Sequence, residues 1–387
     1  MLTPHNCIVR RTSVFLPDTF LYPDKQLWRN GKVRVFVLKQ KVLLFALMCG
    51  VSTVAAAQPF DRNYKEKING TTLHFRVRGE SENNPYLLIL HGGPGFSAHM
   101  FYPWGKSIER AVNVVYLDQR GSGESERLKI KNPLEPRTDE VKDYTIANLL
   151  TDIEGVREFL KVKSWYVLGH SWGGMLGLEY VAAHPDNVTG YLMVDGLLSQ
   201  PLAQDALIAF AEKQLSKDAK SKDKQLKDRV ERLKPFLPYA KELKPSKERL
   251  YSAMQFAFSL FSEIYYADPK AGNAYNAKIQ EANEFYKLPP EAIAPANEPA
   301  AALMLTANYA TRDATPLLAK IKVRTLVING KQDGIIPPKT AELVHKGIAG
   351  SKLLILDKCG HFPFAEQPEA FTKAVLEFVQ AAVPPSK

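Results

Sequence analysis

A serine flanked by glycines stands at the junction of an expected strand and an expected helix. The strand is the apolar run Trp165–Leu168, and the motif that follows it is Gly169-His170-Ser171-Trp172-Gly173. So sharp a turn needs small residues two positions before and after the serine, and it raises the hydroxyl above the sheet edge at the positive end of the helix. The motif therefore predicts a nucleophile at Ser171.

A glycine-rich loop follows another expected strand, Tyr86–Leu90. Its residues are His91-Gly92-Gly93-Pro94-Gly95. Acyl transfer needs backbone N–H donors aimed at the oxygen that becomes negative, and glycine lets main-chain amides approach without obstruction. We expect the oxyanion hole to consist of the amides of Gly93 and Trp172.

Two later strand ends supply an acid and a base. Asp333 follows the run Thr325–Ile328, and His361 follows the run Leu353–Leu356. His361 is expected to take the proton of Ser171 and pass it to the leaving group. The acid orients the imidazole and stabilises its protonated form.

Asp195 is an alternative acid, because it directly follows the expected strand Tyr191–Val194 and both carboxylates can reach the base. We favour Asp333, whose loop more closely resembles the usual acid loop. The order serine, acid, histidine belongs to the α/β-hydrolase fold rather than to chymotrypsin-like or subtilisin-like proteases. We therefore expect a mostly parallel central sheet with helices on both faces.

The strand pattern is broken between about Leu197 and Asp313. This segment has no strand-like run, is rich in Ala, Lys, Glu, Leu and Phe, and has prolines at its joints, which predicts an inserted helical cap. The expected organisation is a leader over 1–57, the first part of the core over 58–196, the cap over 197–312 and the second part of the core over 313–387.

The N-terminal segment concentrates the positive charge. Residues 1–57 hold eight Lys or Arg against two Asp, so +6 of the net charge of +10 lies there. A basic flank, the short apolar run 42–54 and small residues up to Ala57 predict a secretory signal, cleaved near Ala57. Export to the periplasm or the medium is expected; a buried or anchoring helix is the alternative.

Composition and spacing also exclude several classes of partner. The charge after residue 57 is ordinary for a soluble enzyme, so no nucleic acid is expected. No H-E-x-x-H or G-x-G-x-x-G pattern predicts a metal or a dinucleotide cofactor. Cys359 alone follows the leader, and we expect it to pack structurally rather than to replace Ser171 as nucleophile. The expected partner is a small-molecule or short-peptide substrate, with no stable membrane insertion after signal removal.

The chain resembles the proline iminopeptidase-like α/β hydrolases over essentially residues 61–383. The resemblance rests on the segments 91–95 and 169–174 and on the run Asp118-Gln119-Arg120-Gly121-Ser122-Gly123-Glu124-Ser125. It implies release of an N-terminal residue, often proline, from short peptides through an acyl-enzyme, and a structural role for Asp118 and Arg120.

The resemblance also implies cap residues that hold the free amine of the substrate. The candidates are Glu263, Asp268, Glu281 and Glu284, whereas the cap tryptophans of the family are missing, because no Trp follows Trp172.

An aminopeptidase is the leading hypothesis. An esterase or lactonase acting on small acyl groups is the second, because fold does not fix substrate. A catalytically silent binding protein is the third, and the presence of every triad member argues against it.

Overall fold

The computed structural model describes residues 59–132 and 136–381. The expected leader, its cleavage position near Ala57, and the cysteines Cys7 and Cys49 lie outside these residues. Within the described ranges, no helix is both long enough and apolar enough to cross a bilayer.

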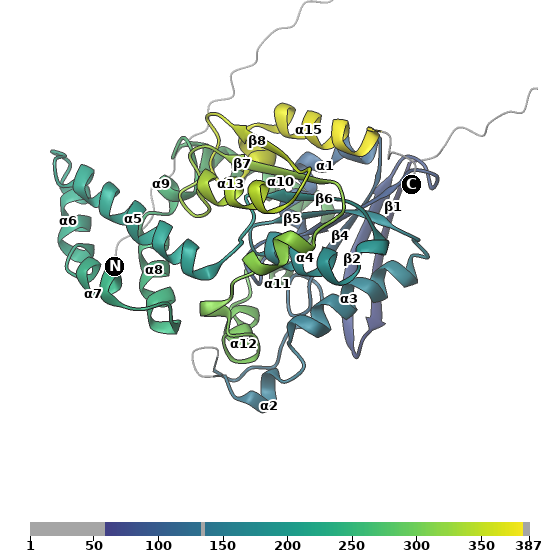
Figure 1. Ribbon diagram of the computed structural model, residues 1–387, viewed down its shortest axis with the longest axis horizontal. Coiled ribbons are helices and arrows are strands. Elements are labelled where there is room, and N and C mark those ends of the chain that lie inside the picture. The colour runs from purple at the N-terminus through teal and green to yellow at the C-terminus, as the bar shows by residue number, and fades with distance from the viewer. Residues whose placement is uncertain (1–58, 133–135, 382–387) are drawn as a thin grey trace, which may run out of the picture. The chain divides into compact units, whose positions relative to one another are not determined.

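An eight-stranded sheet forms the centre of the fold, in the order β1-β2-β4-β3-β5-β6-β7-β8 (Figure 1). The strands are β1 (Phe60–Ile68), β2 (Thr71–Gly79), β3 (Tyr86–Leu90), β4 (Asn113–Asp118), β5 (Trp165–His170), β6 (Val188–Val194), β7 (Thr325–Gly330) and β8 (Lys352–Leu356). Strand β2 pairs antiparallel with β1 and β4, and every pair from β4 through β8 is parallel. The predicted α/β-hydrolase fold is confirmed.

Side chains of the central strands alternate between two helical layers. Leu88 and Leu90 of β3 pack in one apolar cluster with α3, α4 and α13, whereas Leu87 and Ile89 pack in another with α1 and α15. These helices are α1 (Tyr102–Glu109), α3 (Ile146–Phe159), α4 (Trp172–Ala183), α13 (Pro338–Gly347) and α15 (Pro368–Gln380). Because both faces are covered, such strands are continuously apolar in sequence, which is why they could be located there.

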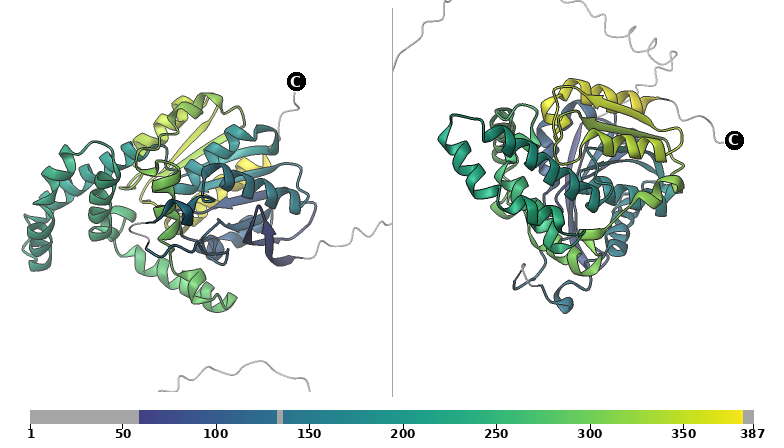
Figure 2. Two further views of the ribbon diagram at one scale, coloured as in Figure 1. Left: turned by 90° about the horizontal axis from the view of Figure 1, so that it is seen from below. Right: turned by 60° about the vertical axis from the view of Figure 1, so that its left-hand side comes forward.

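The chain between β6 and β7 is helical, and none of the strands described above lies in it. Its helices are α5 (Gln200–Asp218), α6 (Lys224–Leu233), α7 (Phe236–Glu242), α8 (Lys247–Ser259), α9 (Phe261–Tyr265), α10 (Ala271–Tyr286), α11 (Pro290–Ile293) and α12 (Glu298–Thr306). Helices α5 to α8 share a separate apolar cluster that includes Phe256 and Leu260, and they lie to one side of the sheet (Figures 1 and 2). The cap predicted over 197–312 lies within this segment, and helices α5 to α12 are called the cap below.

Two short helices complete the core: α2 (Thr138–Val141) and α14 (Pro363–Glu366). Helix α14 begins two residues after His361, and β7 ends three residues before Asp333. The predicted acid and base thus leave the sheet at the carboxyl ends of neighbouring parallel strands. Side chains at such ends lie at the same edge of the sheet, where α/β proteins place their sites.

Candidate active site

Ser171 occupies the tight turn between β5 and α4. Its φ of 56° and ψ of −122° form a conformation that residues other than glycine rarely adopt and that clusters at functional sites. A Cβ on Gly169 would lie 2.2 Å from the carbonyl oxygen of Gly173, and one on Gly173 would lie 2.1 Å from that of Leu90. The turn therefore requires both glycines of the sequence motif.

The predicted oxyanion loop lies directly against this serine. A Cβ on Gly92 would come within 2.9 Å of the Ser171 Cβ and 3.4 Å of its Oγ, so the approach depends on Gly92, which the sequence did not distinguish from its neighbours. Gly93 has a φ of 116°. Trp172 is the first residue of α4, where a backbone N–H has no acceptor within the helix. The amides of Gly93 and Trp172 remain the predicted oxyanion donors.

Asp333 and His361 form a buried pair. The imidazole Nδ1 lies 2.7 Å from Asp333 Oδ2. The other carboxylate oxygen, Oδ1, accepts hydrogen bonds from the backbone N–H groups of Ile335 (2.8 Å) and Ile336 (3.0 Å). With Nδ1–H donating to the carboxylate, Nε2 is the basic nitrogen of His361.

The backbone of His361 is held from two sides. Its N–H donates to the carbonyl oxygen of Tyr265 at 2.7 Å, and its own carbonyl oxygen accepts from His170 Nε2 at 2.8 Å. Burial, followed by the proximity of His361, holds the pKa of His170 well below its usual range, so this donor is a neutral imidazole. Because His170 immediately precedes Ser171, the bond ties the segment of the base to the turn of the nucleophile.

The Ser171 hydroxyl forms no hydrogen bond to any residue that the structure describes, and its side chain is partly exposed. The two histidine rings at 170 and 361 lie with centroids 4.8 Å apart, which places the predicted base beside the residue preceding the nucleophile. Catalytic hydrogen bonds are often long in the absence of substrate and tighten when it binds. The arrangement is thus compatible with proton transfer from Ser171 to His361.

Gln119 links the two halves of the predicted oxyanion hole, a role that the sequence did not reveal. Its side-chain amide donates to the carbonyl oxygen of His91 at 2.8 Å and accepts from the indole N–H of Trp172 at 3.0 Å. Its backbone N–H donates to His91 Nε2 at 3.1 Å. On either side of Gln119, Asp118 accepts hydrogen bonds from backbone N–H groups and lies 2.8 Å from a ring nitrogen of His74 in β2. Arg120 donates to Asp152 in α3. Such bonds are expected for structural residues.

Asp195, the alternative acid, is also buried nearby. One ligand atom each from Asp195, Asp333 and His361 lie within 4.8 Å of one another, a spacing that would admit a metal ion. Backbone N–H groups already bind one oxygen of each carboxylate, including the bond from Gly330 to Asp195 at 2.8 Å. We therefore assign the three groups to a hydrogen-bonded cluster, in which the bond to the imidazole comes from Asp333.

Cys359 is fully buried, two residues before His361. Burial, followed by the charge of nearby carboxylates, raises the pKa of its thiol well above the usual value. A protonated thiol is a weak nucleophile, which agrees with a packing role for Cys359.

The four acidic cap residues proposed to bind a substrate amine have other partners or face solvent. Glu263 pairs with Arg229 at 2.7 Å. Asp268 accepts a bond from a residue of its own turn, Glu284 accepts one from its own helix, and Glu281 is exposed. Within the described ranges, none of the four forms a hydrogen bond or ion pair with a triad member.

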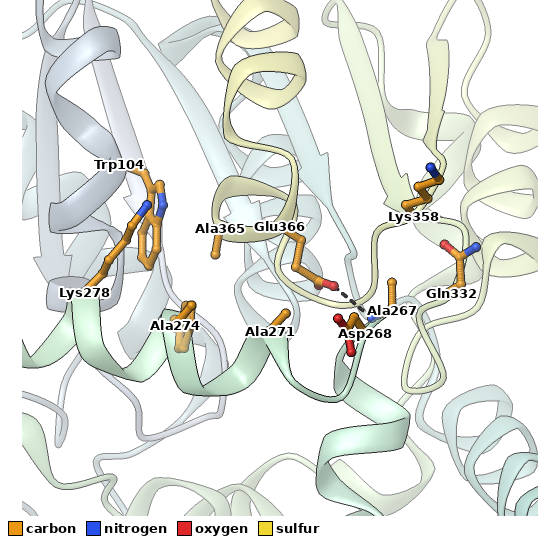
Figure 3. A pocket seen from close by; sticks show the side chains of 11 residues that line it. Trp104, Ala267, Asp268, Ala271, Ala274, Lys278, Gln332, Lys358, Ala365 and Glu366 are labelled. Carbon is orange, nitrogen blue, oxygen red and sulfur yellow. Dashed lines mark hydrogen bonds between the residues drawn. The ribbon is translucent and has the colours of Figure 1, made fainter.

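Glu366 is a further supporting residue that the sequence did not reveal. Its carboxylate accepts from the backbone N–H groups of Ala267 (2.8 Å), Gly360 (3.0 Å) and Phe362 (3.3 Å), and so holds the chain on both sides of His361. Figure 3 shows this carboxylate on the wall of a cavity of about 390 Å³ whose lining includes no triad residue. Burial raises the pKa of Glu366.

The variant Glu366→Gln is expected to lower the free energy of unfolding by about 1–3 kcal/mol. Glutamine keeps one acceptor oxygen for Gly360 and Phe362, but it turns an NH₂ group towards the N–H of Ala267. Urea denaturation measures the change. Glu369→Gln, at an exposed position in α15, is the control and should cost less than about 1 kcal/mol. Equal midpoints for the two variants would contradict the role of Glu366.

Comparison with known proteins places this site in a family. Residues 85–368 match the model of the alpha/beta hydrolase fold. A proline iminopeptidase of Saccharolobus solfataricus is 26% identical over 320 residues, which span 82% of this chain and 92% of the relative. A proline iminopeptidase of Lactobacillus helveticus is 24% identical over 322 residues, covering 80% of this chain and 95% of the relative.

Solved structures show the same fold. The proline iminopeptidase-related protein of Thermus thermophilus superposes with a TM-score of 0.63 at 24% identity, over 84% of this chain and 99% of the other. The predicted resemblance to proline iminopeptidase-like proteins is confirmed. The chain belongs to the α/β-hydrolase fold family and is a hydrolase.

Proposed function

We propose that the chain is a serine hydrolase that releases N-terminal residues from small peptides or amides through an acyl-enzyme on Ser171. The observation on which the chemistry rests is the buried pair of His361 and Asp333, joined at 2.7 Å and tied through His170 to the strained turn at Ser171. The proline iminopeptidase relatives, matched over most of their length, support the substrate class.

The proposed reaction uses the chain's own groups in sequence. The Ser171 hydroxyl attacks the carbonyl carbon of the substrate while its proton passes to Nε2 of His361. The negative oxygen of the tetrahedral intermediate accepts hydrogen bonds from the amides of Gly93 and Trp172. His361 then donates its proton to the leaving amine as the C–N bond breaks. Water then attacks the acyl carbon while His361 takes its proton, and His361 returns that proton to Ser171 Oγ as the acyl C–O bond breaks.

An esterase or lactonase is the second candidate, and the positions of the acidic cap residues favour it. A substrate ammonium group needs a carboxylate partner, whereas the proposed carboxylates bond elsewhere or face solvent. An aromatic ring flanks the predicted base: Tyr265 lies 5.4 Å from His361, centroid to centroid. Such surroundings suit an uncharged acyl group.

A substrate panel separates the two candidates. Prolyl and alanyl p-nitroanilides are expected to be hydrolysed by the full chain. Their N-acetylated counterparts, in which an acetyl group removes the positive charge of the amine, are expected to be poor substrates. Short-chain p-nitrophenyl esters form the third arm. Turnover of esters alone would overturn the aminopeptidase proposal, and equal turnover of free and acetylated amides would show that the amine is not recognised.

We also propose export, on the basis of the basic flank and apolar run before Ala57. N-terminal sequencing of the protein recovered from the periplasm and the medium of an expressing bacterium is expected to find a start near Gln58. An uncleaved chain in the cytoplasmic fraction would contradict it.

A further inference from the structure

Asp195 is a fully buried carboxyl group that the proposed reaction does not use. It directly follows β6 with a φ of 40°, a left-handed conformation that a non-glycine residue adopts at some cost. Its backbone N–H donates to the carbonyl oxygen of Ile328 at 2.9 Å, and its Oδ1 accepts from the N–H of Gly330 at 2.8 Å. The side chain is thereby fixed against the end of β7, where the loop to Asp333 begins.

The second oxygen of this carboxyl group has no partner among the residues that the structure describes. Asp195 Oδ2 is buried from solvent and accepts no hydrogen bond. An ionised Asp195 would therefore bury an unsatisfied charged oxygen, on a carboxylate that has an oxygen within 4.8 Å of one of Asp333. Both conditions are unfavourable, because burial and a like charge each disfavour the ionised form. A proton on Oδ2 removes both.

Asp333 has one acceptor position left for such a proton. A carboxylate offers about four lone-pair positions. The N–H groups of Ile335 and Ile336 occupy two of them on Oδ1, and His361 occupies one on Oδ2. The remaining position is on the same oxygen that accepts from the imidazole.

We propose that Asp195 is a protonated positioning residue that donates a hydrogen bond from Oδ2 to Asp333 and so fixes the carboxylate that orients His361. The pair then carries one negative charge and shares one proton, as close carboxyl pairs do. In agreement, burial and then the charge of Asp333 raise the pKa of Asp195 well above its usual range. The effect on turnover rests on the proposed serine hydrolase activity.

Two variants of Asp195 test the donor. Asp195→Asn keeps an acceptor for Gly330 and supplies an N–H for Asp333, whereas Asp195→Ala removes both. Alanine is expected to lower kcat about 10- to 100-fold with little change in KM, because a hydrogen bond to a charged group is lost. Asparagine should recover most of this loss. Equal kcat values for the alanine variant and the wild type, or an asparagine variant as impaired as alanine, would overturn the proposal.

The pH profile supplies a readout that a merely structural role would not change. If Asp195 is neutral, the asparagine variant has the same charge beside the imidazole, and the acid limb of kcat/KM stays in place. If Asp195 is ionised in the wild type, the variant removes a negative charge that favours protonated His361. The acid limb would then move to lower pH by about one unit or more, which would overturn the proposal.

Infrared difference spectroscopy tests the proton without any turnover. The wild-type full chain at neutral pH is expected to show the carbonyl band of a protonated carboxyl group that disappears in Asp195→Asn. The control Asp186→Asn, at an exposed position, should leave the band unchanged. An active wild type without this band would overturn the inference alone. A wild type that shows the band but hydrolyses no amide or ester would overturn only the proposed function.

Discussion

Replacing Ser171 by alanine is expected to abolish labelling by an organophosphonate and to lower kcat by several powers of ten, on the order of 10⁵- to 10⁶-fold. The hydroxyl oxygen would form the covalent intermediate, and the one thiol among the described residues cannot replace it. The Cys359 thiol is buried and stays protonated. Residual hydrolysis would come only from binding and from the oxyanion donors. Mass spectrometry of the labelled chain and steady-state kinetics measure the two effects.

Ser164→Ala provides a matched control for this variant. Ser164 precedes β5 at the end of the strand opposite to Ser171, and its hydroxyl accepts a bond from Thr189 at 3.0 Å. We expect the Ser164→Ala variant to be labelled at Ser171 and to turn over substrate as the wild type does. Because alanine at 171 removes one oxygen from a partly exposed side chain and breaks no hydrogen bond to the described residues, thermal unfolding should be nearly unchanged. An alanine variant at 171 that retains a tenth of the wild-type kcat would contradict the nucleophile assignment.

Those parts of the fold that depend on local pattern could be predicted from the sequence. The parallel strands are continuously apolar because both faces of the sheet are covered, so their positions were visible without any knowledge of their order. The turn at Ser171 was visible for a similar reason. The close approaches around Gly169 and Gly173 leave no room for a side chain, so both positions are glycine and the motif can be recognised in the sequence.

The residues that support the triad could not be predicted, because their roles depend on contacts between distant segments. Gln119 bonds to Trp172, 53 positions away, and Glu366 bonds to Ala267, 99 positions away. Gln119 lies in the run 118–125 on which the family resemblance rests, but that run does not show which groups the side chain bonds, and the sequence near Glu366 shows no motif. For the acidic cap residues, likewise, the sequence showed the charge but not the partners, such as Arg229 for Glu263.

The sequence also could not separate the roles of the two carboxyl groups at the strand ends. The sequence presented Asp195 and Asp333 as alternatives, because each directly or closely follows a strand and either can reach the base. The structure brings both to one cluster, with the bond to His361 made by Asp333 and the bond from Gly330 accepted by Asp195. A choice between two acids thus becomes a question of which one is ionised and which one carries a proton.

Asp333→Asn is expected to lower kcat about 10⁴-fold, because the amide would impose the wrong tautomer on His361. The N–H groups of Ile335 and Ile336 require an oxygen at the Oδ1 position, which turns the amide nitrogen towards the imidazole. Two N–H donors cannot face each other, so Nδ1 loses its proton and Nε2 gains it. In this neutral tautomer Nε2 already carries the proton of the imidazole, so it cannot accept the proton of Ser171.

The paired variant Asp195→Asn distinguishes this mechanism from a general loss of structure. Each variant replaces one carboxyl of the cluster by an amide of nearly the same shape, yet only the change at 333 reverses a donor and an acceptor at the imidazole. Steady-state kinetics should therefore show a far larger fall in kcat for Asp333→Asn, at equal thermal stability. If the larger fall came from Asp195→Asn, then Asp195 would be the acid of the triad, and Asp333 would be its neighbour.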